Sequence, residues 1–259
     1  MNINNENNLI KLEGKTDLTN LAEEVYNDGG KNFVKELGQA GTTVIGFINN
    51  FFLAPLGIYN AWAKPRIEQV KTNIANRMQN IPSQNLITPP MNVLLSAIDG
   101  LKYNLDEDIL KEKFENLIVN SCNSEYSDKI HPRFAEIIKQ LSSIDAIFLK
   151  ELSSDPTKGF PIANIITSTD SSFKVLFPNC YYSNTLNDIE LSSSIDNLIT
   201  LGLIKVDYSN FIANEKAYEK IYNTKSYKIF KLQEHGNISL QKGILTLSIF
   251  GRNFINVCI

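Results

Sequence analysis

The chain has 259 residues, 43% of them hydrophobic and 20% charged, which is the composition of a globular protein with one large domain or two smaller ones. Its formal net charge is −3, which argues against wholesale nucleic-acid binding because such proteins usually have a basic surface. The Asn-rich start, MNINNENNLI, has neither a basic segment nor an apolar core. We therefore expect no secretory signal, a flexible tail over residues 1–14 and a cytoplasmic protein.

Residues 15–80 are predicted to be a helical region that contains an unusual apolar segment. From Leu37 to Ala63 the sequence has 27 residues without a charged side chain, which is long enough to cross a bilayer. Several polar residues and Pro55 argue against a span. The spacing instead predicts an amphipathic helix that is buried against the protein or a second copy, with a membrane interface as the alternative. The candidate membrane or partner surface consists of Val44, Ile45, Ile48, Phe51, Phe52 and Trp62.

We further hypothesise that the apolar segment, residues 37–63, carries the biological output of the protein. Large buried side chains contribute about 1.5–3 kcal/mol each to folding. If they were released, they would favour insertion into a membrane or self-association. We therefore expect a cytoplasmic protein that associates with a membrane on activation.

Residues 81–155 are predicted to form a central helical domain. The proline-containing stretch 81–90 predicts an extended connector. Apolar residues then recur at helical spacing. The predicted helices begin near Met91, Asp106, Pro132 and Ser143. Proline suits the first turn of a helix, and serine suits the N-cap position.

Several motifs in this region occur together in a fixed order. They are IPSQNLITPP, AIDGLKY, DEDILKEKFENLIVNS and HPRFAEIIKQLSSIDAIFLKEL. In this order they resemble the abortive infection alpha family, most strongly over Ile81–Leu152 and more weakly through residues 198–204 and 245–258. The resemblance implies a role in anti-phage defence, in which an infected cell stops growing or dies before the phage matures. The resemblance carries over no catalytic residues.

Residues 156–259 are predicted to form a winged-helix-like C-terminal domain. A predicted helix over 188–203 is followed by the strand-like LIKVD, and the chain closes with a strand that runs into a final helix. Two further pieces, 173–177 and 227–232, have the composition of strands. The predicted fold class is mainly α, a helical N-terminal and central bundle with a small C-terminal winged-helix-like α+β part.

The predicted helix over 188–203 suits DNA poorly, since it carries Asp188, Glu190 and Asp196 and no basic residue, whereas DNA readout depends heavily on Arg and Lys. A later stretch interleaves lysines with aromatic residues. This stretch is predicted to be a solvated hairpin face whose aromatic side packs inward, and a surface that follows a nucleic-acid backbone is the alternative. The candidate basic surface consists of Lys216, Lys220, Lys225, Lys228 and Lys231.

The sequence contains no recognisable catalytic, cofactor or metal site. His131 and His235 are its only histidines, and neither lies at metal-ligand spacing. His131, just before a proline, is predicted to cap or pack a helix. Cys122, Cys180 and Cys258 form no CxxC pair, which predicts reduced thiols that fill apolar space. Since the hydrolase, dinucleotide-binding and P-loop motifs are also missing, we predict a protein that is not an enzyme.

The leading hypothesis is a non-enzymatic anti-phage protein that acts through protein–protein contacts and through membrane contacts of residues 37–63. A toxin-neutralising immunity protein or antitoxin is the runner-up, and a winged-helix DNA-binding regulator ranks third. The expected partner is a protein, either a phage or host component or a toxin. A homo-oligomer and a membrane surface are further candidates, whereas nucleic acid is not expected.

Overall fold

The computed structural model describes residues 44, 46, 63–168, 172–233 and 237–259. The longer described helices are α3 (Ala63–Met78), α4 (Met91–Lys102), α5 (Asp108–Ser121), α6 (Arg133–Lys139), α7 (Ser143–Leu152), α8 (Asp188–Thr200), α9 (Lys225–Gln233) and α10 (Ile249–Cys258). The described 3-10 helices are η2 (Ser83–Asn85), η3 (Ser124–Tyr126) and η4 (Glu215–Asn223). The described strands are β1 (Phe160–Ser168), β2 (Phe173–Cys180), β3 (Ile204–Asp207) and β4 (Ile238–Leu247).

Helix α5 lies at the centre of the helical part and contacts α3, α4, α6, α7 and α10. Its residues Phe114, Leu117 and Ile118 are fully buried, because they repeat at the three- and four-residue spacing of one helical face. Asparagines on another face reach α10. Asn116 and Asn120 donate side-chain hydrogen bonds of 3.1 and 2.8 Å to carbonyl oxygens in the last turn of α10. These bonds satisfy acceptors that a helix end otherwise leaves unpaired.

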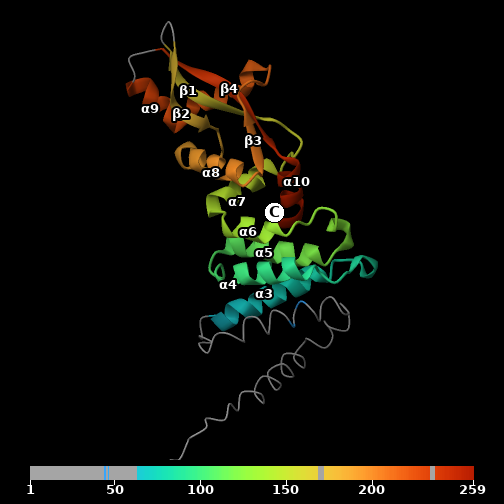
Figure 1. The fold of residues 1–259 in the computed structure, drawn as a ribbon. Coiled ribbons are helices and arrows are strands. Elements are labelled where there is room, and N and C mark those ends of the chain that lie inside the picture. The colour runs from blue at the N-terminus through green and yellow to red at the C-terminus, as the bar shows by residue number, and fades with distance from the viewer. Residues whose placement is uncertain (1–43, 45, 47–62, 169–171, 234–236) are drawn as a thin grey trace, which may run out of the picture.

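The sheet is antiparallel, with the strand order β2-β1-β4-β3. Strand β1, one of the two inner strands, is buried on both faces. Ile162 belongs to the same apolar core as the helices, whereas Ala163 and Ile165 pack with Tyr218 and Tyr227 in a second, smaller core. Helix α8 packs on β2 and β3, while η4 packs on β1 and α9 on β2. Sheet, α8, α7, α5 and α3 follow one another along the molecule in Figure 1.

The predicted fold class is wrong, because the protein has a mixed α+β fold. The sequence prediction had no strand at β1, which supplies the hydrogen-bonded centre of the sheet. A strand that is covered on both faces shows a nearly continuous apolar run rather than the alternation of a half-exposed strand. In β1 this run is IANII, within residues 162–166. In place of the expected small winged-helix-like part, the C-terminal region contains a four-stranded sheet. Its two edge strands, β2 and β3, both contact α8.

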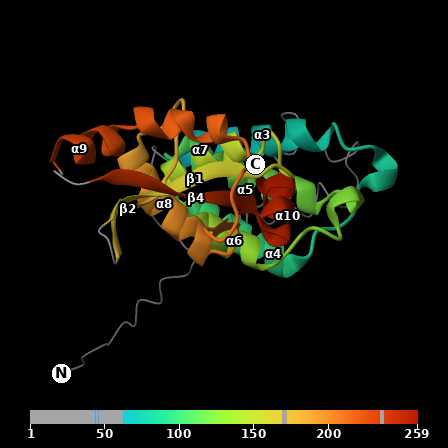
Figure 2. The ribbon, with the colours of Figure 1, turned by 90° about the horizontal axis from the view of Figure 1, so that it is seen from above.

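The predicted strand over residues 227–232 and its hairpin are also wrong, because these residues belong to helix α9. Tyr227 and Phe230, three residues apart, face the second core. Lys225, Lys228 and Lys231 repeat at the same interval and are exposed. This three-residue interval is typical of a helix. In Figure 2, α9 and α10 lie on opposite sides of the labelled strands.

The helices predicted between residues 91 and 152 are confirmed, as are the helix over 188–200 and the closing strand and helix. The predicted cap of α7 is displaced by one residue, since Ser142 and not Ser143 occupies the N-cap. The predicted domain boundaries stay a prediction. One apolar core extends through α3, α5, α8, the sheet and α10.

Most of the apolar segment 37–63 lies outside the described residues, including Ile45, Ile48, Phe51, Phe52 and Trp62. Val44 is described and fully buried in the main core. Among the helices that the structure describes, none combines the length and hydropathy that crossing a membrane requires.

Candidate functional site

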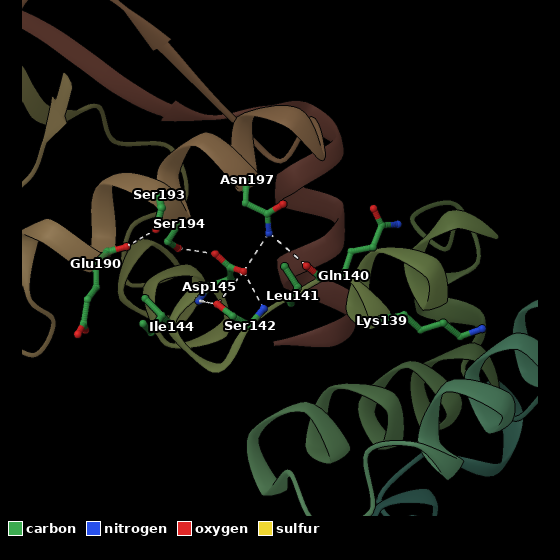
Figure 3. A pocket seen from close by; sticks show the side chains of 10 residues that line it. All are labelled: Lys139, Gln140, Leu141, Ser142, Ile144, Asp145, Glu190, Ser193, Ser194 and Asn197. Atoms are coloured by element: carbon green, nitrogen blue, oxygen red, sulfur yellow. Dashed lines mark hydrogen bonds between the residues drawn. The ribbon is translucent and has the colours of Figure 1, made fainter. Parts of the chain in front are cut away.

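A polar pocket of about 430 Å³ opens where the end of α6 and the start of α7 meet α8. Figure 3 shows the side chains that line it, with Asp145 of α7 at the centre. The lining residues are Lys139, Gln140, Leu141, Ser142, Ile144, Asp145, Glu190, Ser193, Ser194 and Asn197. Residues some fifty positions apart in the sequence thus form one concave surface, which is the usual form of a binding site.

Asp145 first stabilises its own helix. Its carboxylate accepts hydrogen bonds from the backbone N–H of Ser142 at 2.7 Å and from the Ser142 hydroxyl at 2.9 Å. The Ser142 hydroxyl in turn accepts from the backbone N–H of Asp145 at 3.1 Å. This reciprocal pair is a capping box, which satisfies amide groups that the first helical turn leaves free.

The same carboxylate also joins α7 to α8. Ser194 donates its hydroxyl to Oδ1 of Asp145, and the amide of Asn197 donates to Oδ2 at 3.0 Å. Asn197 donates as well to the carbonyl of Gln140, at 3.2 Å. Asp145 therefore receives four hydrogen bonds from two helices, which Figure 3 shows as dashed lines. Three of these bonds end at Oδ2 and one at Oδ1, so donors of the protein itself hold both carboxylate oxygens in place.

Asp145 is only 2% exposed, and within the described part of the chain no lysine or arginine forms an ion pair with it. A buried charge without a counterion is costly unless hydrogen bonds compensate it. Here neutral donors provide that compensation. Removing any of them would leave charge uncompensated, so the arrangement holds α7 and α8 in one relative position.

The rim of the pocket carries side chains that this network does not use. The Glu190 carboxylate is exposed, and Ser193, also exposed, donates to the backbone carbonyl of Glu190 at 2.9 Å. Lys139 lies at the other side and forms ion pairs with Asp99 at 3.0 Å and Glu136 at 3.1 Å. Burial lowers the pKa of Lys139, but its hydrogen bonds to Asp99 and Glu136 outweigh that effect and raise the pKa above its ordinary value. The rim can therefore exchange polar and ionic contacts with a partner.

The candidate basic surface is divided between two elements. Lys216 and Lys220 lie on η4, while Lys225, Lys228 and Lys231 lie on α9, and all five side chains are exposed. The Lys220 ammonium lies 5.3 Å from the centre of the Tyr182 ring, a cation–π distance. None of these five lysines lines the pocket around Asp145.

His131 has the predicted capping and packing role. Its Nδ1 accepts a hydrogen bond of 3.1 Å from the backbone N–H of Arg133, at the start of α6. Its ring lies 5.3 Å from the ring of Phe250, edge to face. His235 lies outside the described residues. In the described ranges, no three His, Cys, Asp or Glu side chains gather where they could hold a metal ion.

The three cysteines are free and buried. Burial raises the pKa of the Cys122 and Cys180 thiols to about 12, and it raises the pKa of Cys258 well above its ordinary value. Because the thiolate is the reactive form of cysteine, these thiols are poor nucleophiles at neutral pH.

We expect that none of the three thiols reacts with a water-soluble aromatic disulfide reagent in the native protein. All three should react once urea unfolds the chain, because unfolding restores exposure and the ordinary pKa near 8.5. The absorbance of the aromatic thiolate that the reagent releases measures the number of reactive thiols in the native and in the unfolded protein. One thiol that reacts within seconds in the native protein would contradict this expectation.

Sequence reasoning missed the Asp145 pocket altogether. The local signal was present, since Ser142 and Asp145 have the three-residue spacing of a capping box. The partners on α8 had no such signal, because nothing in the sequence indicates that Ser194 and Asn197 face Asp145.

The family model described as abortive infection alpha matches residues 64–258, which include every residue that lines the Asp145 pocket. No curated protein and no solved structure matches the chain.

Proposed function

The chain belongs to the abortive infection alpha family, and from that premise we propose that it is a non-enzymatic phage-defence protein that acts by binding a protein partner at the Asp145 pocket. The expected partner is a component of the phage or of the infected host. The proposed place of action is the cytoplasm. Membrane contact through residues 37–63 stays a prediction, since only Val44, Gly46 and Ala63 of that segment are described.

The observation that carries this proposal is the division of roles within the pocket. The carboxylate of Asp145 is 2% exposed and accepts four hydrogen bonds from groups of the protein itself. A general base must come within hydrogen-bond reach of the proton that it removes, and burial keeps this carboxylate away from a substrate. The exposed Glu190 and Ser193, by contrast, are available at the rim of a surface whose shape is held by hydrogen bonds. A fixed polar surface with exposed rim groups suits recognition of another protein.

Charge reversal at the rim tests the proposal. We expect the double substitution Glu190→Arg and Ser193→Arg to weaken binding of the partner by about tenfold or more, or about 1.4 kcal/mol of binding free energy, and thereby to weaken protection against phage. Both side chains are exposed, so packing should not change, and the loss of a favourable acid from the first turn of α8 should cost no more than about 1 kcal/mol. Plating efficiency of phage measures protection, and thermal unfolding measures stability.

Asp128→Arg is the matched control, because Asp128 is an exposed acid outside the pocket. It should leave protection intact. Full protection by the stable double variant would show that the pocket does not bind the partner. Growth of uninfected cells that express the chain alone adds a second measurement, because an effector of growth arrest can slow growth whereas a toxin-neutralising protein should not.

A further inference from the structure

Strand β2 forms one edge of the sheet, and among the described strands it is paired only with β1. Its two ends differ. Near the C-terminal end, the carbonyl of Pro178 accepts a hydrogen bond of 2.9 Å from Ser192 of α8, and α8 packs against this strand. Proline has no N–H to donate to a second neighbouring strand, so within sheets it occurs mainly on edge strands such as this one. The Ser192 bond thus holds the C-terminal end of the strand at Pro178. Residues 173–177 form the rest of the edge.

This open edge carries exposed apolar side chains. Phe173 is 58% exposed and Val175 is 40% exposed. Val175 pairs with Ile166 and Phe177 with Ile165, so Leu176 is an additional residue in a β-bulge. The bulge places Val175 and Phe177 on opposite faces of the sheet, since paired residues share a face and neighbouring residues do not. Phe177 then packs near Phe230 of α9, with the ring centres 6.3 Å apart, while Phe173 and Val175 remain exposed.

Positive charge borders the same edge. Lys174 lies between the two exposed apolar residues and is itself exposed. Helix α9, which packs against β2, adds the exposed Lys228 and Lys231. None of these three lysines forms an ion pair with another described residue. An edge strand has unpaired N–H and C=O groups that can pair with another strand, and the lysines select for negative charge in that strand.

We propose that residues 173–177 of β2 bind an extended acidic segment of a protein partner, which adds a fifth strand to the sheet. Main-chain hydrogen bonds join the segment to the edge, and alternate side chains distinguish its two faces. Apolar side chains of the segment pack on Phe173 and Val175. Acidic side chains on its other face meet Lys174 and the lysines of α9. This surface is separate from the Asp145 pocket, so it can hold a second partner or a second part of the same partner.

A labelled ten-residue peptide in which valine and glutamate alternate is the probe, and fluorescence anisotropy with the full chain measures its binding. We expect saturable binding, and we expect Lys174→Glu and Val175→Ser each to weaken it by about tenfold, which corresponds to about 1.4 kcal/mol. Lys205→Glu is the matched control, because Lys205 is an exposed lysine on β3, the opposite edge strand. That variant should bind the peptide as the natural sequence does.

A peptide with prolines at its two central positions separates strand addition from simple charge attraction. It keeps most of the charge but cannot pair along its length, so it should not bind. Equal binding of both peptides would overturn the proposal, as would the absence of saturable binding by the alternating peptide. Sedimentation tests whether a second copy of the chain occupies the edge. If Lys174→Glu abolished self-association but left peptide binding unchanged, the edge would belong to a second copy, and the proposal would also be overturned.

Discussion

Asp145→Ala is expected to lower the free energy of unfolding by about 3 kcal/mol. The substitution removes the capping box of α7, which contributes about 1 kcal/mol. It also leaves the buried hydroxyl of Ser194 without its acceptor, and an unsatisfied buried donor costs about 1–3 kcal/mol. The half-buried Asn197 amide loses one bond and keeps the other, to the Gln140 carbonyl. The loss therefore falls on two helices at once. Urea unfolding followed by circular dichroism measures the change.

Two further variants make the expected result for Asp145 specific. Asp145→Asn keeps one carbonyl oxygen and the size of the side chain, so it should destabilise the protein less than Asp145→Ala. Asp128→Ala removes an exposed carboxylate that takes no part in the network and should change stability by no more than about 0.5 kcal/mol. If Asp145→Ala were as stable as Asp128→Ala, the carboxylate would not join α7 to α8 in solution.

Gly251→Ala is expected to destabilise the protein by about 3 kcal/mol or more, which is the upper range for overpacking. A methyl group at Gly251 would lie 1.9 Å from the carbonyl oxygen of Leu203. The obstacle is backbone, so α10 as a whole would have to move. That movement would strain the bonds of its N-cap Ser248, whose N–H donates to Leu203 at 3.0 Å and whose hydroxyl donates to Gly202 at 2.6 Å.

Asn256→Ala is the control for Gly251→Ala, because Asn256 lies on the same helix and is exposed. Alanine favours helix formation, so Asn256→Ala should keep or slightly raise stability in the same urea titration. A Gly251→Ala protein that unfolds at the natural urea midpoint would mean that α10 does not approach Leu203 as closely as the structure places it.

The central helices illustrate how much local sequence predicts. Pro132 marks the start of α6, and the spacing of Phe114, Leu117 and Ile118 marks the buried face of α5. Both signals lie within one or two helical turns, the range over which capping and side-chain periodicity act. The order of the motifs from residue 81 to 152 likewise indicated the abortive infection alpha family, which the match over residues 64–258 confirms.

The sequence by itself determined these helices, the family and the burial of the cysteines, because each depends on neighbours in the chain or on composition. Only the tertiary structure decided that β1 is an inner strand of a sheet and that Asp145 joins α7 to α8. Asp145 bonds to Ser194 across 49 positions of sequence, and paired residues of β1 and β4 are 71 to 85 positions apart. Such contacts form when whole elements pack together, and no local pattern of residues specifies which elements will meet.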